Sequence, residues 1–121
     1  MEINELIKEI HENASKKGFW DDWYQIKGSK KHKGLKIESL TVEKNMINNA
    51  IGNRLMMITG EVAEAQEGLR KDDYENFKEE LADIVIRVFD LAGGLDIDLE
   101  AEILSKMSKN KLRPHLHGKT F

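Results

Sequence analysis

The sequence predicts an all-α protein, a bundle of about four to five helices without a β-sheet. Apolar residues recur in several segments at the three- and four-residue spacing of amphipathic helices. No segment alternates apolar and polar residues over a useful length, and the only proline, Pro114, stands near the C-terminus. A length of 121 residues corresponds to about one domain. We therefore expect a single all-α domain over residues 1–121.

Two helices are expected in the first part of the chain. One spans about residues 3–17, and the other spans about residues 42–69 with Thr41 as its N-cap. On a helical wheel the apolar residues of the second helix cover a wider arc than a surface helix needs, which predicts a central position in the bundle. This arc contains Ile47, Ile51, Leu55, Ile58, Val62, Ala65 and Leu69.

The segment between these two helices has no clear periodicity. It starts with an aromatic cluster and continues into a mobile basic loop that we expect at about residues 25–40. Two interpretations of Trp20 stay open: packing between helices, or stacking on a nucleobase as a substrate-binding residue. The aromatic cluster consists of Phe19, Trp20, Trp23 and Tyr24.

Two further helices complete the expected bundle. The third begins at a capping box formed by Asp72–Glu75 and is ended after about residue 92 by Gly93–Gly94. The fourth spans about residues 98–112, because Pro114 prevents its continuation.

The composition excludes several classes of protein. No apolar run approaches the ~18 residues of a membrane span, no secretory signal is recognisable, and the absence of Cys excludes disulfide scaffolds and thiolate zinc sites. We expect a cytoplasmic protein without a membrane partner. The net charge of −3 argues against nucleic acid as a partner. It hides an asymmetry, because residues 61–105 carry 14 acids and 4 bases whereas residues 106–121 carry 5 bases and no acid.

Two pairs of carboxylates stand on or beside predicted core faces. Glu61 and Glu64 are three residues apart on the second helix, and Glu80 and Asp83 repeat this spacing on the third. A carboxylate that faces a core is costly unless it is paired, protonated or metal-bound. Two antiparallel helices joined by a short turn could bring both pairs together, and a divalent cation would relieve their repulsion. Oxygen ligands suit Mg²⁺, or Mn²⁺ in its place.

The basic tail, residues 106–121, supplies the opposite charge. Lys106, Asn110 and Arg113 lie on one stripe of the last helix. Lys and Arg side chains beside a bound cation are suited to a polyphosphate chain, because the cation and the side chains bind different phosphate oxygens. The acidic pairs and the basic tail together indicate a nucleoside di- or triphosphate as the substrate.

Other interpretations of the acidic pairs remain open. Such pairs arise often by chance on acidic helices, and we read the other acids of residues 61–105 as mostly solvent-exposed. Arg54 and Arg87 could neutralise Glu61 and Glu80, and the chain would then be a non-catalytic helical oligomerisation or regulatory module with salt-bridged acidic pairs. A di-iron bundle is disfavoured, because no Glu is followed by His three residues later.

The order and interval of these residues resemble a known family. The segments Glu61-Val-Ala-Glu64 and Glu80-Leu-Ala-Asp83 resemble the Glu-x-x-Glu…Glu-x-x-Asp signature of the MazG-like, all-α nucleoside triphosphate pyrophosphohydrolases. The tail, Lys106-x-x-x-Asn110-x-x-Arg113-Pro, and the segment from His11 to Trp20 are similar to those of small single-domain members.

The resemblance implies an α-helical bundle completed by oligomerisation, as a homodimer or homotetramer. It implies a Mg²⁺-dependent hydrolase that cleaves a nucleoside triphosphate between the α and β phosphates, giving a nucleoside monophosphate and pyrophosphate, in nucleotide-pool sanitation. Glu61 and Glu64 are also the candidates for the catalytic base that orients or deprotonates the attacking water. The implied metal ligands are Glu61, Glu64, Glu80 and Asp83, and the implied phosphate contacts are Lys106, Asn110 and Arg113.

Overall fold

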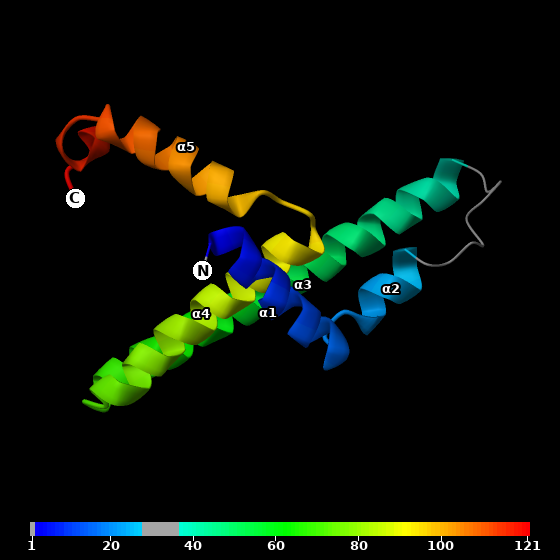
Figure 1. Ribbon diagram of the computed structural model, residues 1–121, viewed down its shortest axis with the longest axis horizontal. Helices are drawn as coiled ribbons and strands as arrows, with labels where there is room; N and C mark the ends of the chain where they lie inside the picture. Colours follow the sequence, from blue (N-terminus) through cyan, green and yellow to red (C-terminus); the bar gives the residue numbers. More distant parts are fainter. Residues whose placement is uncertain (1, 28–36) are drawn as a thin grey trace.

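Figure 1 shows the computed structural model, which describes residues 2–27 and 37–121. The described residues form five α-helices and a short 3₁₀ helix and contain no strand, so the predicted all-α class is confirmed. None of these helices combines the length and the apolar composition that a membrane span needs. The elements are α1 (Ile3–Lys16), α2 (Asp21–Lys27), α3 (Ile37–Arg70), α4 (Tyr74–Gly94), α5 (Leu99–Lys111) and η2 (His115–Gly118).

Helices α3 and α4 form a long antiparallel hairpin that is the frame of the molecule (Figure 1). The chain reverses at Asp72, which adopts a φ of 56°. Helix α4 then begins at its N-cap Asp73, whose side chain accepts a 3.0 Å hydrogen bond from the backbone N of Asn76. The cap is therefore one residue later than the capping box predicted from Asp72.

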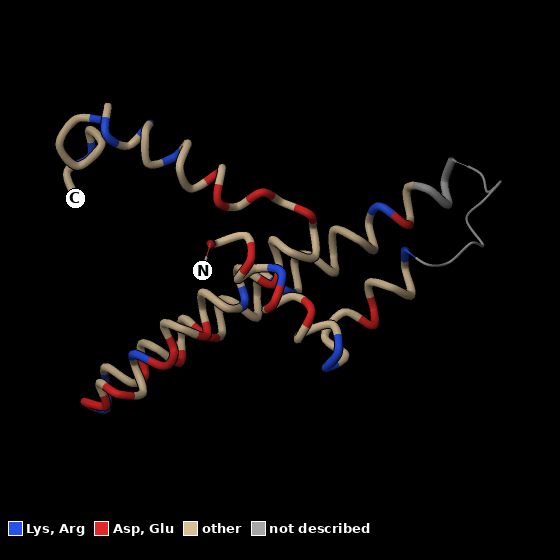
Figure 2. Tube along the Cα trace, in the orientation of Figure 1, with Lys and Arg blue, Asp and Glu red and all other residues tan. Residues whose placement is uncertain are grey.

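Helices α1 and α2 lie against different parts of this hairpin, whereas α5 projects away from it (Figure 1). Helix α1 packs on α4, and α2 packs on α3. Helix α5 is tied to α1 by Asp98, which accepts bonds from Nδ2 of Asn4 at 3.0 Å and from the backbone N of Ala101 at 3.1 Å. The basic tail on α5 is consequently held apart from the acidic half of the hairpin (Figure 2).

The core of the single chain is centred on Trp20, which is completely buried. Two glycines in the last turn of α4 make room for α1 and for this indole. A Cβ atom on Gly94 would come within 2.0 Å of the indole ring, and one on Gly93 within 2.7 Å of the Cβ atom of His11. The predicted helix end at Gly93–Gly94 is thus also a packing surface.

The structure differs from the prediction between the first two expected helices. Residues 21–27 form α2, which is too short to show a period in the sequence. Helix α3 begins at Ile37 rather than at residue 42, so Thr41 lies inside the helix and is not its N-cap. The basic loop expected at about 25–40 is shortened at both ends, and its centre, residues 28–36, lies outside the described residues.

Part of the apolar arc predicted for the central helix is not covered within one chain. Leu55, Val62 and Leu69 recur every seven residues on α3 and are 52%, 50% and 48% exposed. On α4, Leu81 and Val85 are each 46% exposed. These five residues are called the open apolar face below. The expectation that the α3 members are buried is wrong for the single chain.

Candidate functional site

Three carboxylates meet across the α3–α4 hairpin. Glu61 and Glu64 come from successive turns of α3 and Glu80 comes from α4, and ligand oxygens of all three lie within 4.8 Å of one another. The three-residue spacing puts the two α3 side chains on one side of that helix. These three residues are called the acidic cluster below. Asp83, the fourth predicted ligand, is not in this group and instead lines the pocket beside it.

Glu80 is the most strongly perturbed member of the acidic cluster. Its Oε2 atom is buried and has no hydrogen-bond partner among the described residues. Burial, and then the neighbouring carboxylates of Glu61 and Glu64, raise the pKa of Glu80 from 4.5 to about 7. Both effects disfavour the charged form. An orphaned buried oxygen is rare in folded proteins, so this atom is placed to meet a proton or an external ligand.

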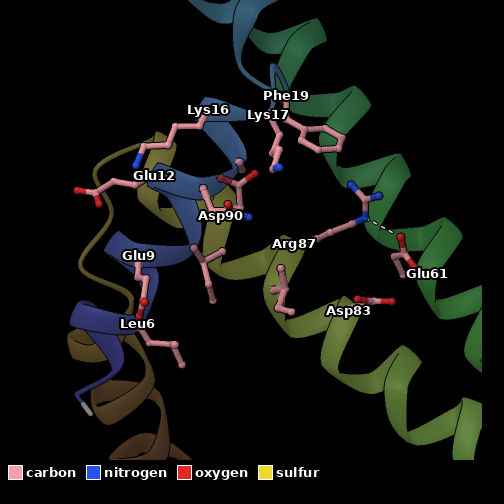
Figure 3. A pocket seen from close by; sticks show the side chains of 14 residues that line it. Leu6, Glu9, Glu12, Lys16, Lys17, Phe19, Glu61, Asp83, Arg87 and Asp90 are labelled. Carbon is pink, nitrogen blue, oxygen red and sulfur yellow. Dashed lines mark hydrogen bonds and ion pairs between the residues drawn. The ribbon is translucent and has the colours of Figure 1, made fainter.

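Glu61 is neutralised by an arginine of the neighbouring helix. Nε of Arg87 on α4 donates to Oε1 of Glu61 at 2.7 Å (Figure 3). This bond is the main reason why the pKa of Glu61 lies below its usual range. The ion pair considered from the sequence is therefore present for Glu61. Arg54 is engaged elsewhere, since its Nη2 lies 2.7 Å from Oδ1 of Asp22.

A pocket of about 800 Å³ opens beside the acidic cluster, between α1 and α4 (Figure 3). Glu61, Asp83 and Arg87 line it, and the Arg87 side chain points from α4 toward Glu61 on α3. Lys17 and Phe19 lie on the side of Arg87 away from Asp83, and Phe19 is 54% exposed. The volume is within the ~300–1,000 Å³ typical of small-ligand sites. An aromatic ring, basic groups and carboxylates thus border one cavity.

Asp90 links Trp20 and α1 to α4. Nε1 of Trp20 donates to Oδ1 and Oδ2 of Asp90 at 2.8 and 3.1 Å, and Nδ1 of His11 lies 2.9 Å from Oδ1. The Arg54 guanidinium lies over the Trp20 ring, 4.1 Å from its centroid. Because Trp20 is completely buried, the packing interpretation accounts for it, and its ring is not open to a nucleobase in this structure. Asp90 is an exception among the other acids of residues 61–105, which the sequence predicts to be mostly solvent-exposed, because its side chain is only 19% exposed.

The three predicted phosphate contacts of the tail lie apart from the acidic cluster within one chain. Lys106 and Asn110 are exposed on α5, and Arg113 is exposed just beyond its end. Nη1 of Arg113 lies 2.6 Å from Nδ1 of His117. Since α5 points away from the hairpin (Figures 1 and 2), a single chain does not bring the basic tail to the acidic cluster.

Sequence reasoning missed the α1 side of the pocket. Lys17 and Phe19 were not singled out as site residues, and they approach Arg87 only because α1 packs on α4. The sequence puts Lys17 at the end of the first predicted helix and Phe19 in the aromatic cluster, but neither position specifies which residues these side chains face.

Comparison with known proteins adds one finding. The sequence model of the MazG-like family matches residues 49–119, more than half of the 121-residue chain. The matched segment contains the acidic cluster and all of α4 and α5. No curated protein and no solved structure matches the chain.

Proposed function

Because the chain belongs to the MazG-like family, we propose that it is a Mg²⁺-dependent nucleoside triphosphate pyrophosphohydrolase. It hydrolyses its substrate between the α and β phosphates, releasing a nucleoside monophosphate and pyrophosphate, and acts in nucleotide-pool sanitation. The observation that carries this proposal is the acidic cluster, which has a buried, unpartnered oxygen and borders a pocket of nucleotide size.

The acidic cluster fits a hard divalent cation. Its donors are all carboxylate oxygens, which Mg²⁺ and Mn²⁺ accept. Three carboxylates in such proximity repel one another, and Arg87 engages only Glu61. The buried Oε2 of Glu80 is the donor that gains most from a cation, because it has no hydrogen-bond partner among the described residues.

The carboxylates supply cation ligands and a base in the proposed reaction. Glu61, Glu64 and Glu80 hold the cation, and Asp83 lies at the edge of the pocket where it can join them. A bound Mg²⁺ supplies positive charge that stabilises the phosphoryl group during transfer. Glu64 is exposed at the rim of the cluster, which favours it over Glu61 as the base that orients the attacking water.

The non-catalytic alternative, a module whose acidic pairs are salt-bridged, has one observation in its favour. The Arg87–Glu61 ion pair is the contact that it predicts. This pair leaves the buried oxygen of Glu80 without a partner, however, and does not account for the adjoining pocket. The hydrolase proposal accounts for both features.

A second copy of the chain completes the proposed enzyme, as a homodimer or homotetramer. On each helix of the hairpin, the open apolar face is rotated about 100° around the helix axis from the side that contacts the other helix. The direction of this rotation is the same on both helices. Antiparallel helices are related by a two-fold axis, so both stripes lie on one side of the hairpin, opposite α1. Heptad spacing of Leu55, Val62 and Leu69 is typical of helix-to-helix packing. Two such hairpins placed face to face would form a four-helix core.

The same assembly offers a place for the tail. In a single chain α5 leaves the hairpin, so Lys106, Asn110 and Arg113 cannot reach their own acidic cluster without a rearrangement of α5. We expect these residues to act across a subunit interface, where their positive charge complements the acidic half of a neighbouring hairpin.

The activity is tested with a panel of canonical and modified nucleoside triphosphates and Mg²⁺, with released pyrophosphate as the readout. We expect turnover of at least one triphosphate. Glu61→Gln and Glu80→Gln should each lower kcat/KM by about a hundredfold or more. Glu79→Gln is the matched control, since it removes an equal charge from an exposed neighbour of Glu80.

The role of Asp83 is tested in the same assay with Asp83→Asn, which should reduce turnover if Asp83 joins the metal ligands. Absence of pyrophosphate release with every triphosphate would refute the proposed function. Full activity in both Glu61→Gln and Glu80→Gln would refute the proposed site.

A further inference from the structure

Among the described residues, Arg87 is the basic side chain bound to the acidic cluster. It comes from α4, one turn beyond Asp83, and its Nε reaches Oε1 of Glu61 on α3 at 2.7 Å (Figure 3). The Arg87 side chain is 32% exposed, whereas that of Glu61 is 14% exposed. The guanidinium therefore caps a mostly buried carboxylate while keeping contact with the open pocket.

A cation bound at the acidic cluster would weaken this contact. Arg87 holds one oxygen of Glu61, a carboxylate that the cluster offers as a ligand, and a guanidinium beside a divalent cation is repelled. Arg87 and the cation therefore compete for the same carboxylate. An arginine cannot lower this repulsion by deprotonation, because it stays charged in proteins.

The pocket provides space for the Arg87 guanidinium once it leaves Glu61. Arg87 lines the 800 Å³ pocket and also the smaller cavity between Phe19, Arg54 and Met57. A nucleoside triphosphate in the pocket, with its phosphates at the acidic cluster, would put phosphate oxygens within reach of the Arg87 side chain. Arginine binds phosphate through two parallel hydrogen bonds, which makes it a strong partner for that position.

We propose that Arg87 is a displaceable counter-ion: it holds Glu61 while the acidic cluster is free of metal, and turns into the pocket to bind substrate phosphates once the cation is bound. This inference rests on the proposed function. It assigns to a residue of α4 a phosphate contact that lies within the same chain as the acidic cluster, unlike the residues of the α5 tail.

The proposal predicts opposite effects of one substitution on two ligands. Arg87→Met removes the competitor of the cation, so Mn²⁺ alone should bind about fivefold tighter. The same variant lacks the phosphate contact, so KM for the nucleoside triphosphate should rise about tenfold. A merely structural Arg87 would instead weaken both, because its loss would disorder the cluster.

The first measurement is isothermal titration of Mn²⁺ into the full chain without nucleotide, for the wild type, Arg87→Met and Arg87→Lys. Arg87→Lys keeps the charge without the planar fork and should bind Mn²⁺ nearly as the wild type does. Arg70→Met is the control for net charge, since Arg70 is exposed in the last turn of α3. It should leave Mn²⁺ affinity unchanged. Circular dichroism verifies that each variant is folded.

The second measurement is KM and kcat of the same variants with the best triphosphate of the panel. Tighter Mn²⁺ binding together with a raised KM in Arg87→Met supports the proposal. Unchanged or weaker Mn²⁺ binding, or an unchanged KM, overturns it and leaves the proposed function standing if the wild type hydrolyses its substrate. A wild type that neither binds Mn²⁺ nor releases pyrophosphate overturns both.

Discussion

The indole of Trp20 lies directly on the bare Cα of Gly94, so closely that a Cβ atom there would be 2.0 Å from the Cη2 atom of the ring. The ring is completely buried in this position, and its Nε1 donates to Asp90 one turn earlier on α4. The glycine and the aspartate together fix the loop after α1 against the hairpin that carries the acidic cluster.

Gly94→Ala is expected to destabilise the protein by about 2–3 kcal/mol, because neither the rigid indole nor the helix backbone can yield enough to admit a methyl group. Urea denaturation measures the change in the free energy of unfolding. Gly52→Ala is the control, since nothing lies within 4 Å of its added Cβ. This control should stabilise the protein by about 0.5–1 kcal/mol through helix propensity. Equal effects at both sites would contradict the packing role of Gly94.

The Trp20–Asp90 hydrogen bonds should show direct energetic coupling. Trp20→Phe keeps most of the ring but removes the donor, which leaves the partly buried Asp90 carboxylate with its contact to His11. We expect Trp20→Phe to cost about 1–3 kcal/mol. A double-mutant cycle with Asp90→Ala measures the coupling, which should exceed about 0.5 kcal/mol. Additive effects would mean that the two side chains act independently.

The metal-free protein should lose stability as the pH rises through the range in which Glu80 titrates. The pKa of Glu80 is raised from 4.5 to about 7 in the folded state. The folded state therefore holds this proton more tightly than the unfolded state, and the associated stability is lost between these two pH values. Glu80→Gln mimics the neutral form, so it should raise the urea midpoint at pH ~8 but not at pH ~4.

Glu79→Gln, in the presence of a chelator, is the control for this pH dependence. Glu79 is exposed and stands next to Glu80 in the sequence, so its removal should shift the midpoint little at either pH. A midpoint gain in Glu79→Gln as large as that in Glu80→Gln would attribute the effect to net charge rather than to the buried oxygen.

The open apolar face should hold the assembly together. Val62→Lys places a charge at the centre of the exposed apolar stripe of α3, where burial against a second copy would desolvate it. We expect dissociation to monomers in analytical ultracentrifugation. Ala63→Lys adds the same charge one residue along, about 100° around the helix, and should leave the sedimentation coefficient unchanged. A wild type that sediments as a monomer would contradict the proposed assembly.

Local sequence patterns predicted the helices well where each helix carries its own signals. The apolar periodicity of α1, α4 and α5 is a property of neighbouring residues, so the approximate bounds of these helices followed from the sequence. The short helix α2 and the early start of α3 at Ile37 did not follow. Their positions depend on packing against the rest of the chain, including Trp23 on Ala50.

The acidic cluster was predicted only in part. The three-residue spacing and a short turn were enough to place Glu61, Glu64 and Glu80 together, because helix geometry fixes which side chains share a side. The same reasoning could not separate Asp83 from the group. It also left Trp20 open between packing and substrate binding, since a helical wheel does not tell how distant segments cover a face.

Periodicity, caps and spacing act within a few residues along the chain, so they were sufficient to predict the helical class, the hairpin of α3 and α4 and the carboxylates at its centre. Three features became visible only in the packed fold: Arg87 holds Glu61, Asp90 holds Trp20, and α5 carries the basic tail away from the acidic cluster. Each of these depends on which helices touch, which is set by burial and charge summed over residues far apart in the sequence.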